Sequence, residues 1–193
     1  MKEEYELIWK LAKPYYLKGR EMDVSHIDWM MQEAEIVCEK EGLNEELLLP
    51  LVILHDVGYA EVKKGNPFDH KLRVTHMKAG AQIALRILNR IEYSPEQTER
   101  IAYFISVHDN WALGDYEVYK KSKILAAFND LDFIWLCVKE GFEAVRKILG
   151  KNHSEMIEYL EAEGKLETRN FATKTTKELF ENSLEDRKKE IKK

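Results

Sequence analysis

A histidine and an aspartate stand side by side at the end of a nearly continuous apolar run, in the stretch LPLVILHDVGYAEV from Leu49 to Val62. Burying a titratable pair is costly unless each group is hydrogen-bonded, paired with an opposite charge or bound to a metal. Imidazole and carboxylate together suit divalent first-row metals, whereas Ca²⁺ prefers oxygen ligands alone. His55 and Asp56 therefore suggest a metal site, although an ordinary capped helix end would explain the dipeptide taken alone.

Other histidines and aspartates could complete such a site. His26 lies near the start of a helical segment, from which it can face the histidine–aspartate pair. Two acids, Asp130 and Asp132, interrupt the apolar stretch FNDLDFIWL. Asp132 follows Phe128 by four residues and shares its core-facing side of a helix, whereas Asp130 points further away. Because an acid on the core side needs a partner, this phase favours Asp132 and leaves Asp130 as the alternate.

In this order the residues resemble the HD superfamily of metal-dependent phosphohydrolases, which is named for its H…HD…D pattern of metal ligands. The resemblance covers roughly Ser25 to Leu136, most of the chain. Members with two metals add a histidine from each of two further regions, and His76 in THMKAGAQIALRIL and His108 in YFISVHDNW have similar places. The resemblance thus implies a set of six ligands, with Asp130 as the alternate for the last: His26, His55, Asp56, His76, His108 and Asp132.

The resemblance also implies metal-assisted hydrolysis of a nucleotide or another small phosphate ester. A divalent ion lowers the pKa of its water ligand and polarises a phosphoryl oxygen; Mn, Co, Mg, Ni, Zn or Fe would serve, as one ion or two. Asp56 is the natural bridge between two ions, because a carboxylate has two oxygens. A cation such as Lys64, Lys71 or Arg73 would neutralise negative charge developing on the phosphate. Two other classes stay open: a di-iron oxygenase like inositol oxygenase, and a metal-stabilised helical protein without catalysis.

Helices must position these residues, because apolar residues recur at helical spacing along nearly the whole chain. In the first half of the chain, we predict a helix around Leu7–Leu11 that ends near Pro14, a second from a Ser25 N-cap to Gly42, and a third over Glu45–Val57 that is capped by Asn44. A fourth helix carries His76 and Leu88, and a fifth begins at Ser94 and Pro95, with Gln97 completing a capping box. A sixth covers Lys121–Lys139, and about two charged amphipathic helices cover 150–193. The stretch from Gly58 to about Asp69 is predicted to be a loop. The expected fold class is all-α: a compact, HD-domain-like bundle with its metal site in a central cavity.

Composition sets the remaining expectations. A length of 193 residues suits a single helical domain, with residues 20–140 as its metal-binding core. The net charge of −5 argues against dedicated nucleic-acid binding, and the absence of any apolar run of about 18 residues argues against a membrane span. Two distant cysteines, Cys38 and Cys137, favour reduced buried thiols and a cytoplasmic location. The expected partner is a small phosphorylated substrate, and a homo-oligomer stays open.

Overall fold

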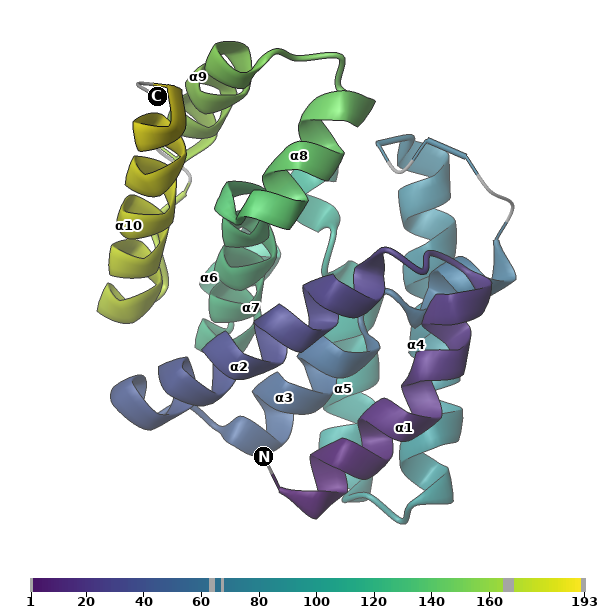
Figure 1. The fold of residues 1–193 in the computed structure, drawn as a ribbon. Helices are drawn as coiled ribbons and strands as arrows, with labels where there is room; N and C mark the ends of the chain where they lie inside the picture. The colour runs from purple at the N-terminus through teal and green to yellow at the C-terminus, as the bar shows by residue number, and fades with distance from the viewer. Residues whose placement is uncertain (1, 63–64, 67, 165–168, 192–193) are drawn as a thin grey trace.

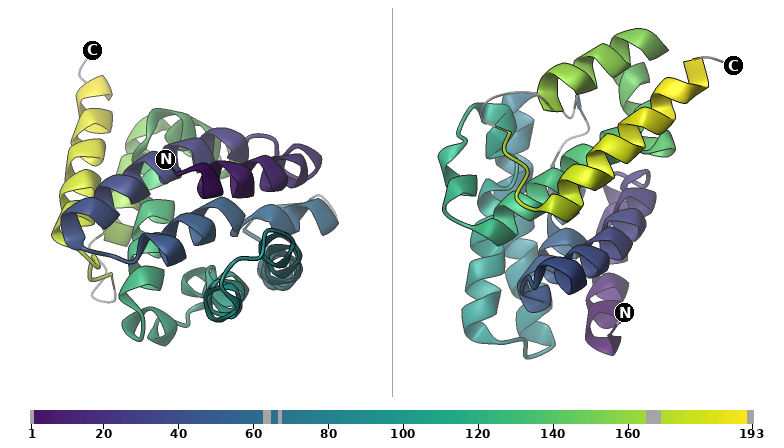
Figure 2. Two further views of the ribbon diagram at one scale, coloured as in Figure 1. Left: turned by 90° about the horizontal axis from the view of Figure 1, so that it is seen from below. Right: turned by 90° about the vertical axis from the view of Figure 1, so that its left-hand side faces the viewer.

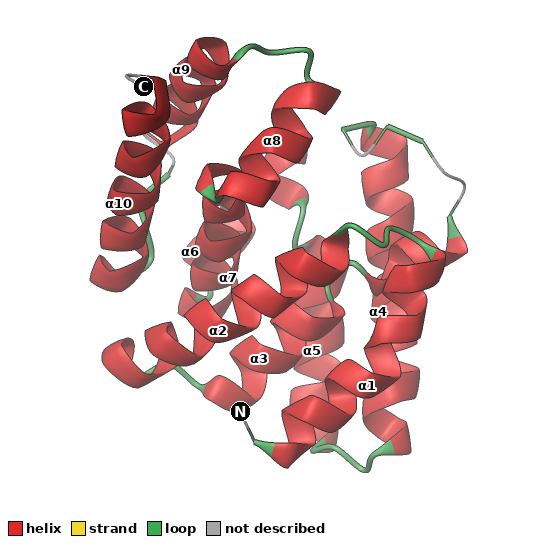
Figure 3. Cartoon of the chain, viewed as in Figure 1, coloured by secondary structure: helices red, strands yellow, loops and turns green. Residues whose placement is uncertain are grey.

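The computed structural model describes residues 2–62, 65–66, 68–164 and 169–191, and every regular element within them is a helix (Figures 1 and 3). The α-helices in these ranges are α1 (Glu3–Lys18), α2 (Asp23–Glu41), α3 (Glu45–Leu54), α4 (His70–Arg90), α5 (Pro95–Val107), α6 (Glu117–Lys120), α7 (Lys123–Ile134), α8 (Lys139–Ile148), α9 (His153–Gly164) and α10 (Lys174–Ile191). Three short 3-10 helices join them: η1 (Val57–Glu61), η2 (Asn110–Leu113) and η3 (Trp135–Cys137). The all-α prediction is confirmed.

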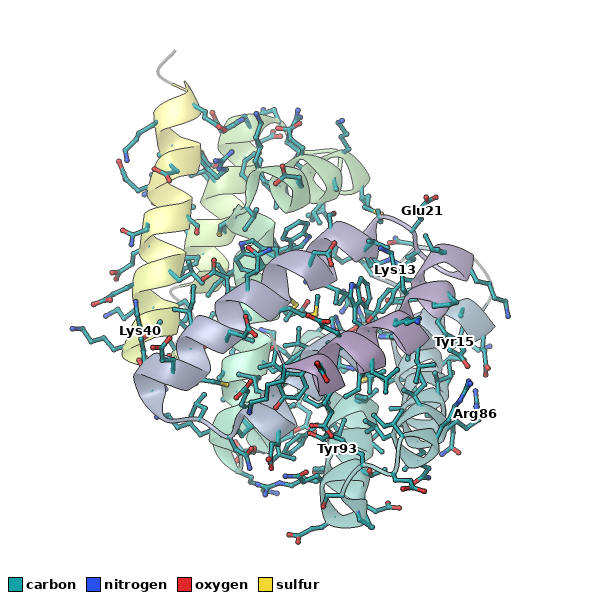
Figure 4. All side chains as sticks on the ribbon, turned by 60° about the horizontal axis from the view of Figure 1, so that its bottom comes forward. Lys13, Tyr15, Glu21, Lys40, Arg86 and Tyr93 are labelled. Atoms are coloured by element: carbon teal, nitrogen blue, oxygen red, sulfur yellow. The ribbon has the colours of Figure 1, made fainter. Side chains whose placement is uncertain are left out.

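The larger hydrophobic core is built around α3. Every residue from Leu47 to Leu54 is buried, as expected for a helix that is apolar on all its faces. Helices α1, α2, α5 and α7 all pack against it, and α4 packs along α5. Side chains fill the space between these helices, while charged residues such as Lys40 and Arg86 project outward (Figure 4). His55 and Asp56, which directly follow α3, are therefore buried in this core.

A second, smaller core joins the end of α7 to the C-terminal helices. Its centre is a stacked pair, Phe133 and Phe180, whose ring centres lie 5.5 Å apart. Helix α10 runs along one side of the molecule and packs against α9, α7 and α2 (Figure 2). Trp29 and Leu179 contact both cores. The predicted charged, amphipathic helices of the C-terminal part are thus packed against the helices of the larger core.

Several predicted boundaries are wrong for identifiable reasons. Helix α1 continues through Pro14, which is exposed. Proline has no backbone N–H, so one carbonyl of the preceding turn loses its donor, but water can satisfy it at the surface. Helix α2 begins at Asp23, ahead of the expected Ser25 cap. The predicted loop after Gly58 begins instead as the 3-10 helix η1. Gln97 completes no capping box, because its side chain donates to Glu46 Oε2 at the surface and Ser94 makes no capping hydrogen bond.

Other local predictions are confirmed. The Asn44 side chain accepts a hydrogen bond from the Glu46 backbone N–H and so caps α3. Gly42 ends α2 in the left-handed conformation, with φ of 63°. Cys38 and Cys137 are buried free thiols. Within the described ranges, no helix combines the length and the apolarity that a bilayer-crossing segment would need.

Candidate metal centre

Five elements bring the predicted ligands to one edge of the larger core. His26 lies on α2, His76 on α4 and Asp132 on α7. His55 follows the last residue of the buried helix α3, and His108 follows the last residue of α5, which is buried on one face. All four of these histidines are buried. A cluster of imidazoles at this depth requires a partner for every ring nitrogen.

Asp56 lies between two groups of histidines. Its Oδ1 is 3.3 Å from His76 Nε2 and 3.4 Å from His108 Nε2. Its Oδ2 is 3.6 Å from His55 Nε2. On that second side, the Asp132 carboxylate lies 3.3 Å from His26 Nε2 and 3.9 Å from His55 Nε2. The predicted ligand atoms thus form two sets, His26–His55–Asp132 and Asp56–His76–His108, with the Asp56 carboxylate between them. Asp23, which was not predicted, forms a third candidate set with His26 and Asp56.

Backbone contacts orient three of the rings toward this centre. The Nδ1 atoms of His55, His76 and His108 lie 2.9, 3.3 and 2.8 Å from the carbonyl oxygens of Val52, Leu72 and Ile105. A carbonyl only accepts a hydrogen bond, so Nδ1 carries a proton in each ring, and Nε2 presents a lone pair whenever the ring is neutral. This is the arrangement that second-sphere hydrogen bonds impose on metal-binding histidines.

Two of the four Nε2 atoms lack the protein partner that such burial requires. Those of His26 and His55 have no hydrogen-bond partner among the described residues. Those of His76 and His108 lie 3.3 Å from each other and 3.3 and 3.4 Å from Asp56 Oδ1, so a proton or a cation must lie among these three atoms. Divalent ions would satisfy all four nitrogens, so the donor set fits metal ligation.

Burial and charge act against each other at this centre. Burial lowers the pKa of His55 to about 4, against the opposing effect of the nearby carboxylates. Burial also disfavours the charged form of His108, but the hydrogen bond with Asp56 prevails and raises its pKa to about 9. Burial would raise the pKa of Asp56 and Asp132, yet the surrounding imidazoles hold that of Asp56 well below its usual range and lower that of Asp132 to about 2. Both carboxylates are therefore anionic at neutral pH.

The sequence matches the family model described as HD domain over residues 24–168. The chain belongs to the HD domain family. The resemblance noted in the sequence is therefore confirmed, and with it membership of a superfamily of metal-dependent phosphohydrolases. No curated protein and no solved structure gives a match to the chain.

Of the two candidate acids on α7, Asp132 faces the histidines, and Asp130 faces the C-terminal segment. Asp130 was expected to point further from the core, and this is wrong: it is 3% exposed, while the Asp132 side chain is 32% exposed. The Asp130 Oδ2 accepts hydrogen bonds from the Ala172 N–H and the Thr176 hydroxyl, from the segment that covers this side of α7. Asp130 thus holds the C-terminal segment in place, and the geometry favours Asp132 as the ligand.

Glycine allows the HD pair to approach α4. A Cβ on Gly58 would lie 1.9 Å from the His76 carbonyl oxygen and 2.6 Å from the Gly80 nitrogen. A Cβ on Gly80 would in turn lie 3.2 Å from the His55 carbonyl oxygen. These are backbone atoms that cannot turn aside, so the two glycines set how closely Asp56 and His76 can approach.

Sequence reasoning missed a group of residues beside the HD pair. Arg20 pairs with Asp23 at 2.9 Å, lies 3.9 Å from Asp56 Oδ2 and stacks on the Tyr59 ring. The Tyr59 ring in turn stacks on His76, with ring centres 4.1 Å apart. Burial raises the pKa of Asp23 to about 7 in spite of Arg20. The i, i+3 spacing from Arg20 to Asp23 and on to His26 is the signal that could have identified them.

A cleft of about 710 Å³ opens onto the centre. His26, Asp56, His108 and Asp132 are among the residues that line it. Of the cations predicted to face the substrate, Arg73 lines the cleft, where it forms an ion pair with the Asp109 carboxylate. Lys71 is exposed on α4, and Lys64 lies outside the described residues.

Proposed function

We propose that the chain is a metal-dependent phosphohydrolase that holds two divalent ions bridged by Asp56 and acts on a small phosphate ester such as a nucleotide. The observation that carries the proposal is the position of the Asp56 carboxylate, one oxygen toward His76 and His108 and the other toward His55. Family membership supports the reaction class. A cleft of about 710 Å³ supports the size of the substrate, because sites for small molecules span about 300–1,000 Å³.

Each set of ligands would hold one ion. His26, His55 and Asp132 would bind the first, while His76 and His108 would bind the second, with Asp56 shared. Mn, Co, Mg, Ni, Zn and Fe all fit imidazole and carboxylate ligands. When bound, such ions supply the Lewis acidity that makes water a nucleophile near neutral pH and stabilises charge on a phosphoryl oxygen.

The chain's own residues would bind and orient the substrate. The Arg73 guanidinium at the cleft wall would contact a phosphate oxygen while Asp109 holds its orientation. Arg20 would hold the Asp23 and Asp56 carboxylates in place, because it faces both of them. Aromatic side chains line the remaining wall and would exclude water from the organic part of the ester: Trp111, Tyr116, Trp135 and Tyr159.

Metal analysis joined to an activity screen tests this proposal. Protein purified with and without oxygen would be analysed for metals and assayed against nucleotides and simple phosphate esters. Two ions per chain and hydrolysis supported by Mn²⁺, Co²⁺ or Mg²⁺ are the expected results. Two irons per chain without phosphatase activity would instead indicate the oxygenase class, and stable metal without any turnover would indicate a metal-stabilised binding protein.

A further inference from the structure

A third arginine lines the same cleft, and it comes from the C-terminal segment just before α10. Arg169 is 7% exposed and lines the wall together with the ligands His26 and Asp132. Its Nε and Nη1 atoms are buried and have no hydrogen-bond partner within the described part of the chain. Such an arginine is unusual, because buried cations are normally paired and hydrogen-bonded.

Aromatic rings flank this guanidinium. Its central carbon lies 4.2 Å from the ring centre of Trp111 and 3.8 Å from that of Phe133. Cation–π contacts of this kind stabilise the charge and hold the guanidinium plane, but they do not satisfy its N–H donors, which lie in that plane. The rings therefore fix the orientation of Arg169 while leaving its in-plane donors available to an acceptor.

The nearby acids do not supply that acceptor. Asp130, Glu163 and Asp132 all act on Arg169 electrostatically, but none of the three forms an ion pair with it within the described ranges. The Asp130 Oδ2 is occupied by the Ala172 N–H and the Thr176 hydroxyl, and Asp132 faces His26. Burial consequently lowers the pKa of Arg169, the direction expected of a desolvated cation without a counterion.

We propose that Arg169 is a specificity-determining residue that binds a phosphate group of the substrate through its in-plane N–H donors. A phosphate presents paired oxygens that match the guanidinium fork. Phe133, which Arg169 contacts, directly follows Asp132, so this anion site adjoins the metal centre on the side of α7, whereas Arg73 adjoins it beside Asp109. The inference rests on the proposed hydrolase function, and it adds that the substrate must place an anionic group against α7.

The test compares Arg169→Met with Arg100→Met in the full-length protein as purified. Arg100 also lies over an aromatic ring, that of Phe104 at 5.6 Å, but it is exposed on α5 and is absent from the cleft lining, so it controls for loss of a stacked arginine. Calorimetric titration with inorganic phosphate should show about tenfold weaker binding in Arg169→Met, because hydrogen bonds to charged groups are among the stronger ones. Arg100→Met should bind phosphate like the parent, and the metal content should be unchanged in both.

Two further measurements separate this role from a structural one. The thermal midpoint of Arg169→Met should equal or exceed the parent's, because a desolvated charge is replaced by an apolar side chain that still contacts the rings. Arg169→Lys, which keeps the charge but loses the planar fork, should bind phosphate several-fold more weakly than the parent while remaining folded. Phosphate affinity within twofold of the parent in Arg169→Met would overturn the inference, whatever its stability.

Kinetics distinguish the source of the bound phosphate. With p-nitrophenyl phosphate as substrate, Arg169→Met should raise KM far more than it lowers kcat. Weaker binding of inorganic phosphate with an unchanged KM would overturn the assignment to substrate and leave Arg169 as a site for free phosphate. If the parent binds phosphate through Arg169 but shows no hydrolysis with any metal, the proposed function fails while the anion site stands.

Discussion

Replacing Gly58 by alanine should pull apart the contact that holds Asp56 against α4. The new Cβ would lie 1.9 Å from the His76 carbonyl oxygen, and relaxing this to ordinary contact at 3.4 Å requires η1 to move by about 1.5 Å. Asp56 lies two residues before Gly58, and its distances to His76 and His108 are only 3.3 and 3.4 Å. A shift of this size would separate the carboxylate from both histidines.

The structure gives a rough magnitude for this perturbation. Overpacking of this kind costs about 1–3 kcal/mol. In a chain of this length each kcal/mol lowers the thermal midpoint by about 2–4 °C, so the expected fall is about 2–12 °C. Metal analysis of Gly58→Ala should show loss of the ion held by Asp56, His76 and His108.

Gly150→Ala is a matched control. Gly150 has φ of 66° and open space around its Cβ position, so alanine there adds backbone strain of roughly 1–2 kcal/mol without any clash. This variant should melt at a lower temperature than the parent but retain its full metal content. If Gly58→Ala bound as many ions as the parent, the packing of η1 on α4 would not be what positions Asp56, and the reasoning would be wrong.

The remaining predictions concern the ligands and one buried acid. Asp132→Asn should weaken metal binding by more than about tenfold, because losing even a residue that only orients a metal ligand lowers metal affinity by about tenfold or more. Asp130→Asn should keep the parent's metal content. If Asp130→Asn lost the metal and Asp132→Asn kept it, Asp130 would be the ligand. Replacing His76 and His108 together by alanine should lower the metal count from two to one, and a count of one in both proteins would make them substrate-binding residues. Burial raises the pKa of Asp130 to about 7, so the folded chain retains a proton there that an unfolded aspartate, with a pKa of about 3.9, releases. Asp130 therefore lowers stability increasingly as pH rises from about 4 to about 7. Urea unfolding of the protein, with its metal removed by a chelator, would give the free energy of unfolding at pH 5 and pH 8. This free energy should fall less between the two pH values in Asp130→Asn than in the parent, and an equal fall would contradict the prediction.

The set of six candidate ligands was implied by the resemblance to the HD superfamily, and the local pattern of apolar residues agrees with it at four positions. His76 and His108 lie on the apolar faces of their helices, and a helix packed by its apolar face carries such residues inward. His55 and Asp56 close a helix that is apolar all round, so they had to emerge inside the core. Helical period thus predicts that these four side chains point inward, whereas their role as ligands was implied by the resemblance.

Residues whose environment depends on distant segments could not be predicted in this way. Helical phase says which face Asp130 occupies, but not that Ala172 and Thr176 from the C-terminal segment cover that face and bond the carboxylate. Arg169 likewise reaches the cleft only because its segment returns to contact Trp111 and Phe133. The surroundings of Asp130 and Arg169 depend on how distant segments pack, and the spacing of apolar residues along the chain does not predict that packing.

The most direct test of the central claim is anomalous X-ray scattering from crystals of the metal-loaded protein, measured at the absorption edge of the bound metal. Two peaks are expected, on opposite sides of the Asp56 carboxylate. One should lie among His26, His55 and Asp132, and the other should lie beside His76 and His108. A single peak, or peaks away from Asp56, would contradict the claim that this carboxylate bridges two ions.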